Sequence, residues 1–325
     1  MRLLYVVLGF RVTTLLLTGG TGFIGAALID AVLERTDWRI VSLERLYSTN
    51  PAHGRFISSD RLARFYHDVC APFPERLLSE IGEARYIVHA GTEVSGIRSI
   101  SDPRYSIEAS VLGTTNILEA ARSLRPERVI YLSSIEAVGP CARPISLPEN
   151  APLRPSNPYA AAKAAGEMLV GGYVRSFLVP GVVVRSVNLF GPRQGTERFV
   201  AKVIREMMDK REIVCHVDAK GMPGSRHWLH VDHCVASLMA LLVGAEPGET
   251  YHVVGPERDN LEMIEMIGAR FGKPFKIVKR AAGKTHDQRY SITDTKIRAS
   301  FEKDFEDKLN ETVDWYMRFD GWGRA

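Results

Sequence analysis

A tyrosine and a lysine four positions apart, Tyr159 and Lys163, are the sharpest candidates for chemistry in this sequence. Residues at this spacing share one face of a helix, so the two side chains point the same way. A free tyrosine hydroxyl has a pKa of about 10 and is a poor base at neutral pH, but a nearby ammonium group stabilises its phenolate. Such a group can take a proton from a sugar or alcohol hydroxyl while hydride leaves the same carbon. Because many helices hold Tyr and Lys at this spacing by chance, the assignment depends on its context.

That context is a glycine-rich turn near the N-terminus. Residues 15–17 form an apolar run, glycines recur at every third position between residues 18 and 25, and apolar residues then continue at helical spacing. The pattern predicts a strand, a tight turn and a helix, in which the backbone can approach a diphosphate and the first N–H groups of the helix point toward it. The residues expected to bind the cofactor here are Gly19, Gly22, Phe23, Ile24 and Gly25.

A second predicted strand, residues 38–43, leads into Glu44 and Arg45. An acid at this distance from the glycines bonds the adenosine ribose in a dinucleotide-binding fold. An arginine here can accept the 2′-phosphate of NADP, whereas a glutamate repels it. We therefore expect NAD rather than NADP as the cofactor.

Strand and helix patterns alternate through the first part of the chain. Strand patterns cover residues 64–67, 86–89, 128–132 and 181–188, and one long helix is predicted over residues 99–124. This alternation predicts an α/β fold with a doubly wound parallel sheet, which binds its ligands at the carboxyl ends of the strands. The candidate residues at those ends are Asp68, Val69, Ala90, Gly91 and Ser134.

Beyond residue 188 the pattern breaks, and we expect the chain to cross between two lobes. A Rossmann NAD-binding domain is predicted over residues 1–187, rejoined by about 228–256. Residues 188–227 and 257–325 are predicted to form a smaller, discontinuous substrate-binding domain, with a last helix near residues 311–319.

Composition narrows the class of protein. The 325 residues are 45% apolar and 25% charged, as in ordinary soluble globular proteins. The formal net charge of +4 comes from interspersed basic and acidic residues, so we expect no nucleic-acid partner. Four widely spaced cysteines without a CxxC pattern suit a reducing cytoplasm. Residues 1–10 resemble a signal peptide only faintly, and no other segment is long and apolar enough to span a membrane.

A group of potential metal ligands, His227, His230, Asp232, His233 and Cys234, lies in one short stretch. The stretch spans a predicted strand end and helix start, which would splay these side chains. We therefore predict no metal site.

The sequence resembles the extended short-chain dehydrogenase/reductases, the NAD-dependent epimerase/dehydratase family that modifies nucleotide sugars. The resemblance rests on residues 18–25, 185–192 and 226–232, together with the set of Ser134, Tyr159 and Lys163. It implies that Tyr159 is the base, that Lys163 lowers its pKa and holds the nicotinamide ribose, and that Ser134 orients the substrate hydroxyl.

Within the family, residues 98–100, 228–233 and 286–292 are similar to stretches of the dTDP-glucose 4,6-dehydratases. The resemblance implies a nucleotide-diphosphate sugar as substrate and a homodimer formed through the helices near residues 99–124 and 157–176. It also implies which residues contact the cofactor and the substrate. These are Glu44 with the adenosine ribose, Asp68 and Val69 with adenine, Ala90 and Gly91 with the central region of NAD, and Asn188, Arg226 and Lys284 with the substrate.

Glu136 bears on the choice of reaction. In 4,6-dehydration, oxidation at C4 acidifies the C5 proton, a glutamate removes it, water leaves C6 and hydride returns to C6. The resemblance places Glu136 as that glutamate, although a plain loop residue is the alternative. Ile135 stands where the dTDP-glucose dehydratases have an aspartic acid that protonates the departing water. Ser95, Ile97 and Ser110 also depart from the sugar pocket of those enzymes.

Rival functions remain open at this point. A nucleotide-sugar 4-epimerase needs Tyr159, Lys163 and Ser134 but no acid at position 135, and net oxidation would indicate a dehydrogenase. A non-catalytic NAD-binding sensor would explain the altered pocket, although it has no need for the intact trio. The sequence favours 4,6-dehydration with NAD as a transient hydride carrier.

Overall fold

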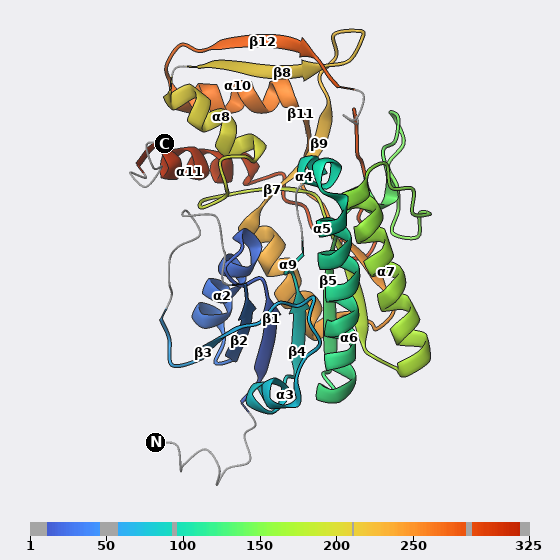
Figure 1. Ribbon diagram of the computed structural model, residues 1–325. Coiled ribbons are helices and arrows are strands. Elements are labelled where there is room, and N and C mark those ends of the chain that lie inside the picture. The colour runs from blue at the N-terminus through green and yellow to red at the C-terminus, as the bar shows by residue number, and fades with distance from the viewer. Residues whose placement is uncertain (1–11, 46–57, 93–95, 210, 284–287, 319–325) are drawn as a thin grey trace.

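The computed structural model describes residues 12–45, 58–92, 96–209, 211–283 and 288–318 (Figure 1). Within them, a parallel seven-stranded sheet has the order β10-β6-β5-β4-β1-β2-β3. The strand order reverses between β1 and β4, and an open α/β sheet binds its ligands at such a switch point. The doubly wound α/β prediction is therefore confirmed. The strands are β1 (Thr14–Thr18), β2 (Arg39–Glu44), β3 (Leu62–Tyr66), β4 (Tyr86–His89), β5 (Arg128–Ser134), β6 (Gly181–Ser186) and β10 (Thr250–Val253).

The central strands of this sheet carry apolar side chains on both faces, and each face is buried in a hydrophobic core. On β1, Leu15 and Leu17 pack into the core on one face, and Leu16 packs into the core on the other. Successive side chains of a strand point to opposite faces, so a strand covered on both sides reads as a continuous apolar run. Helices α2 (Phe23–Arg35) and α9 (Val231–Gly244) cover the first face. Helices α3 (Glu75–Ile81), α6 (Gly113–Leu124) and α7 (Pro158–Phe177) cover the second.

The single long helix predicted over residues 99–124 is wrong. The segment is divided into α4 (Gly96–Ser101), α5 (Pro103–Ile107), the π-helical turn η2 (Glu108–Leu112) and α6. The break lies at Asp102, whose side chain accepts a hydrogen bond from the Tyr105 N–H and so caps α5. Pro103 cannot donate a hydrogen bond to the preceding turn, and its ring starts a new helix.

The second lobe lies at the top of Figure 1 and has a core of its own. It contains a sheet of β11, β9 and β7, and a separate parallel pair of β8 and β12, which come from segments far apart in the chain (Figure 1). Three helices pack around the buried Trp228. The elements are β7 (Asn188–Phe190), α8 (Phe199–Met208), β8 (Glu212–Val217), β9 (Ser225–His230), β11 (Glu257–Asp259), α10 (Asn260–Phe271), β12 (Lys276–Ala281) and α11 (Phe305–Arg318).

Two features of this lobe differ from the sequence expectation. The last helix begins at Phe305 rather than near residue 311, because the buried Phe305 and Leu309 anchor an additional turn and a half against α8 and α10. Strand β12 was not predicted, since its charged residues are exposed and carry no apolar pattern. Among the described residues, no helix combines the length and the apolar character needed to cross a membrane.

Candidate active site

The glycine turn joins β1 to α2 and is closed by its own backbone. Gly19 has a φ of 78°, in the left-handed region that favours glycine, and its carbonyl accepts a hydrogen bond from the Gly22 N–H at 2.9 Å. A Cβ atom on Gly25 would lie 2.0 Å from the Gly19 carbonyl oxygen. Helix α2 can therefore start directly against the turn only because position 25 has no side chain, which leaves its first N–H groups facing the end of the sheet.

A cavity of about 480 Å³ opens at this edge of the sheet, between the two lobes. The cofactor-binding predictions that line it are Gly19, Gly22, Phe23, Ile24, Gly25, Glu44, Val69, Ala90 and Gly91. The four catalytic predictions, of which Ser134 is also a substrate prediction, line it too, together with the substrate prediction Asn188. They are Ser134, Glu136, Tyr159, Lys163 and Asn188. The second lobe contributes residues that the sequence did not identify, including Gln194, Phe199 and Trp228.

The Lys163 amine occupies a fixed position in this cavity. Its Nζ donates a hydrogen bond to the Leu132 carbonyl at 2.8 Å and another to the Thr92 hydroxyl. The side chain is only 3% exposed, and Tyr159 on the same face of α7 is 7% exposed. The Tyr159 N–H donates to Ser99 Oγ at 3.2 Å, which ties the start of α7 to α4. Thr92 was missed because nothing in the sequence marks a threonine after β4 as the partner of a distant lysine.

The carboxyl end of β5 places Ser134 and Glu136 in the cavity. Ser134 Oγ caps the short helix η3 (Ile135–Val138) by accepting a hydrogen bond from the Glu136 N–H at 3.2 Å. Glu136 Oε2 accepts a hydrogen bond from Asn157 Nδ2 at 2.9 Å. Ile135 points the other way, into the core beneath the sheet, and is 3% exposed. Asn157 was missed, although an Asn that precedes Pro and a helical run is a recognisable N-cap signal.

The far end of the cavity holds the residues predicted to bind adenosine. Glu44 Oε1 accepts a hydrogen bond from Ser42 Oγ at 2.9 Å and forms an ion pair with Arg64. Arg45 donates to Asp68 Oδ1 at 3.0 Å and to the Tyr105 hydroxyl at 2.6 Å. The guanidinium that could have favoured a 2′-phosphate is thus paired with a carboxylate.

Asp68 lies beside the cavity rather than on its lining, and Val69 takes the place next to it. Burial alone would raise the pKa of Asp68, but the Cys70 N–H and the Arg45 guanidinium outweigh burial and hold that pKa below its ordinary value. Asp68 is therefore ionised, and its predicted contact with adenine stays a prediction.

A buried histidine connects the glycine turn to β4. Thr18 Oγ1 is 2.7 Å from His89 Nδ1 and accepts a hydrogen bond from the Gly91 N–H at 2.9 Å. Burial, with the charge of Lys163 as a second cause, lowers the pKa of His89 to about 3, so the imidazole is neutral at physiological pH. This contact holds the ends of β1 and β4 together, where Gly19 and Gly91 touch.

Besides Ser134, which lines the cavity, the three other substrate-binding predictions are placed differently. Asn188 lines the cavity, whereas Arg226 does not. The Arg226 guanidinium donates to the backbone carbonyls of Ser225 and Gln288 and lies over the Tyr290 ring at 5.0 Å. Arg226 and Trp228 are two residues apart on β9, so they share a face of that strand, and Trp228 does line the cavity. Lys284 lies outside the described residues.

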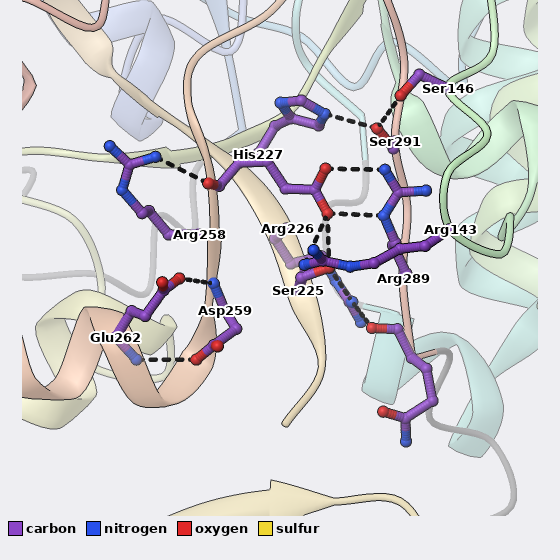
Figure 2. A network of polar contacts seen from close by, with 12 residues as sticks. Arg143, Ser146, Ser225, Arg226, His227, Arg258, Asp259, Glu262, Arg289 and Ser291 are labelled. Carbon is purple, nitrogen blue, oxygen red and sulfur yellow. Dashed lines mark hydrogen bonds and ion pairs between the residues drawn. The ribbon is translucent and has the colours of Figure 1, made fainter. Parts of the chain in front are cut away.

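Figure 2 shows the network that fixes β9 and the segment after residue 287. Glu257 accepts two hydrogen bonds from Arg289 and one from Ser225. Burial alone would raise the pKa of Glu257, but the bonds from Arg289 and Ser225 lower it to about 2. His227 bonds to Ser291 in the same network (Figure 2) and also to the Gly255 carbonyl.

Two of the histidines considered as metal ligands make contacts with different partners. His227 contacts Ser291, and His233 pairs with Asp304 at 2.9 Å. In the part of the chain that the structure describes, no three His, Cys, Asp or Glu side chains are placed to hold a metal ion together.

Comparison with known proteins identifies the family. Residues 15–254 match the model of the NAD dependent epimerase/dehydratase family. The chain belongs to this family. A dTDP-glucose 4,6-dehydratase from Streptomyces niveus is 34% identical, with 95% of this chain and 94% of the relative covered. The low-salt glycan biosynthesis protein Agl12 of Haloferax volcanii is 31% identical, with 93% and 98% covered.

Solved structures agree with this assignment. The crystal structure of DesIV, a dTDP-glucose 4,6-dehydratase from Streptomyces venezuelae with NAD bound, superposes with a TM-score of 0.86 at 29% identity and covers 95% of this chain and 98% of that one. A UDP-N-acetylglucosamine 4-epimerase from Methanobrevibacter ruminantium shares the fold with a TM-score of 0.85 at 20% identity, with 95% of this chain and 99% of that one covered.

The cofactor of the family is NAD, and the residues of this chain fit it. Gly19 and Gly25 leave free the space that Cβ atoms would fill at the turn, and Gly91 does the same at the end of β4. Glu44 lines the end of the cavity where the adenosine ribose belongs. The expectation of NAD is confirmed, while the individual residue assignments stay predictions.

Proposed function

We propose that this family member is a nucleotide-sugar 4,6-dehydratase. The observation that supports the proposal is a single cavity that joins the glycine turn to Ser134, Glu136, Tyr159 and Lys163. The same cavity extends to Asn188 and the second lobe, where a sugar nucleotide has room. The relatives named dTDP-glucose 4,6-dehydratase support the same reaction.

In the proposed mechanism, NAD when bound accepts hydride from the sugar and later returns it. Tyr159 takes the proton of the C4 hydroxyl, and the Lys163 ammonium stabilises the phenolate. Ser134 donates a hydrogen bond that orients the hydroxyl. The resulting ketone acidifies the C5 proton, so that Glu136 can remove it.

The elimination that follows needs a proton for the leaving hydroxyl. The C5–H electron pair forms the C5=C6 double bond as the C6–O bond breaks. Ile135 is buried in the core and has no proton to give. Glu136, which carries the proton taken from C5, returns it to the hydroxyl, and water leaves. One carboxyl group thus serves as base and then as acid. When hydride is returned to C6, C5 takes up a proton that comes from solvent, which completes the balance of atoms.

A second candidate, nucleotide-sugar 4-epimerisation, is favoured by that same Ile135. Epimerisation uses Tyr159, Lys163 and Ser134 alone, so an isoleucine at position 135 carries no penalty. Incubation of the purified protein with a panel of nucleotide sugars separates the two reactions. A 4-keto-6-deoxy product, which absorbs light in alkali, supports dehydration, and a sugar inverted at C4 refutes it.

The remaining assignments belong to the same proposal. The division into a Rossmann domain of residues 1–187 with about 228–256 and a substrate domain of 188–227 with 257–325 would place the cavity between the two. Its boundary would fall within β9, where Trp228 packs into the core of the second lobe and Leu229 into the core of the large sheet. Asn188, Arg226 and Lys284 would hold the diphosphate of the substrate. We also propose that the protein is cytoplasmic and forms a homodimer, and an apolar groove on α7 and η2 supports the dimer. Its lining residues are Val111, Ala165, Met168, Leu169, Gly172, Tyr173, Ser176 and Phe177.

A further inference from the structure

Asn157 occupies the start of the helix that carries the proposed catalytic pair. It is the N-cap of α7, and its Oδ1 accepts a hydrogen bond from the Ala160 N–H at 2.9 Å. An amide side chain has one oxygen acceptor and one NH2 donor group. Because the cap uses the oxygen, the NH2 group must face away from the helix, and it donates to Glu136 Oε2 at 2.9 Å.

The cap therefore determines that the NH2 group of Asn157, and not its oxygen, faces the Glu136 carboxylate. A donor stabilises a carboxylate in its ionised form, and hydrogen bonds to charged groups are among the stronger ones in proteins. The N-terminus of a helix also carries a partial positive charge, and α7 is 20 residues long. Both effects act on Glu136 from the same element.

The same helix turn determines the distance between two chemical groups. Tyr159 lies two residues after Asn157, so one short stretch holds the phenol and, through the amide, the carboxylate. From these contacts we propose that Asn157 is a positioning residue, which holds Glu136 as an oriented carboxylate for removal of the C5 proton. The inference rests on the proposed dehydration, because only that reaction uses Glu136.

A matched pair of variants separates this role from helix capping. Asn157→Ser and Asn157→Asp both keep a good N-cap, so both should fold with unchanged thermal stability. Serine is too short to reach Glu136, and aspartate places an acceptor against it. We expect kcat to fall about tenfold in Asn157→Ser and about a hundredfold in Asn157→Asp, with KM changed less than about twofold. Because oxidation at C4 precedes the affected step, bound NADH, seen by its absorbance at 340 nm, should accumulate in both variants.

A double-mutant cycle tests whether the effect passes through Glu136. In a Glu136→Gln background, Asn157→Ser should change kcat by less than about twofold, because the partner carboxylate is already gone. An equal factor in both backgrounds, or full turnover in Asn157→Asp, would overturn the inference.

A readout without substrate completes the test. In protein labelled with ¹³C at glutamate Cδ, the Glu136 signal is assigned by its loss in Glu136→Gln, and it should move in Asn157→Ser. An unmoved signal contradicts the contact. If none of the nucleotide sugars tested causes the native enzyme to form NADH, the proposed function fails. The NMR result still reports on the contact of Asn157 in that case.

Discussion

Two hydrogen bonds hold the Lys163 amine in place in the cavity. Its Nζ donates to the Leu132 carbonyl, which can only accept, and to the Thr92 hydroxyl. Both bonds suit a charged ammonium, which is the form that stabilises a neighbouring phenolate. The charge also contributes to the lowered pKa of the buried His89, so its field extends through the end of the sheet.

Removal of the Tyr159 hydroxyl group tests the role of this residue in proton transfer. Tyr159→Phe keeps the buried ring and loses only the hydroxyl, so the protein should fold and retain NAD. Turnover of the nucleotide sugar should fall by a factor of about 10² to 10⁴, the usual contribution of a general acid–base group. Turnover within twofold of the native rate would show that another group moves the proton.

A pair of glycine substitutions, one of them a control, tests whether the glycine turn between β1 and α2 binds NAD. Gly25→Ala would place a Cβ 2.0 Å from the Gly19 carbonyl oxygen, so α2 must move away from the turn. We expect the unfolding free energy to drop by about 1–3 kcal/mol and the protein to be purified without NAD. Gly244→Ala is the control, because Gly244 ends a helix and nothing beyond its chain neighbours and the backbone of its own helix lies within 4 Å of its Cβ position. Equal NAD content in both variants would contradict a role of the glycine turn in binding NAD.

Among the elements, α7 does most of the positioning. Asn157, Tyr159, Lys163 and Glu167 all lie on this one helix, which packs against β5 and β6. Glu167 accepts hydrogen bonds from Ser133 and from the buried Arg185. These bonds tie the helix to the sheet directly below Ser134.

Loss of the Glu167 carboxylate should therefore be costly. Glu167→Ala leaves the Arg185 guanidinium buried without its main partner, which typically costs about 3–5 kcal/mol. Glu80→Ala removes half of an exposed i,i+4 pair with Arg76 and should cost less than about 1 kcal/mol. Chemical denaturation of both variants measures the difference. Similar losses would mean that the buried pair has no special role in anchoring α7.

The elements themselves were largely predictable from the sequence, and their side-chain pairings were not. Continuous apolar runs identified the strands, because β1, β4 and β6 are covered on both faces. Pro103 divided a helix that apolar spacing alone made continuous. The pairing of Glu44 with Arg64, and of Glu136 with Asn157, joins residues that lie on different elements. Such contacts depend on how strands and helices pack, and no local pattern encodes them.

At the scale of the whole molecule, one apolar surface has no cover within the described chain. Met168 lines the groove on α7 and η2 and is 63% exposed. In a homodimer, Met168→Glu would bury a charge at the interface and should give a monomer by light scattering. Met222→Glu is the control, since Met222 is 61% exposed on a loop of the other lobe. A native protein that is monomeric at micromolar concentration would refute the dimer.

Buried histidines make the stability of the fold depend on pH. Burial is the main cause that lowers the pKa of His230 and of His252 to about 4, and of His89 to about 3. Below pH 6.5 the unfolded chain binds protons at these sites and the folded chain does not, so stability is lost as pH falls from 6.5 toward 4. The loss is roughly 1–2 kcal/mol per imidazole between pH 7 and pH 5.

Denaturation across this range tests the assignment to particular residues. His230→Asn keeps an N-cap for α9 and removes the imidazole, so the pH dependence between 5 and 7 should become shallower. His216→Gln changes an exposed histidine and should leave the dependence as it is. Identical pH dependence in native protein and His230→Asn would show that His230 does not titrate differently on unfolding.

The central claim is that Tyr159, Lys163, Ser134 and Glu136 act together on a nucleotide sugar over the glycine turn. The most direct measurement is NMR of the products formed from nucleotide sugars in D2O with the purified protein. The account predicts a 4-keto-6-deoxy sugar with deuterium at C5, formed at least about a hundred times more slowly with Tyr159→Phe or Glu136→Gln. A sugar inverted at C4 that keeps its C5 proton, or no conversion of any nucleotide sugar, would contradict it.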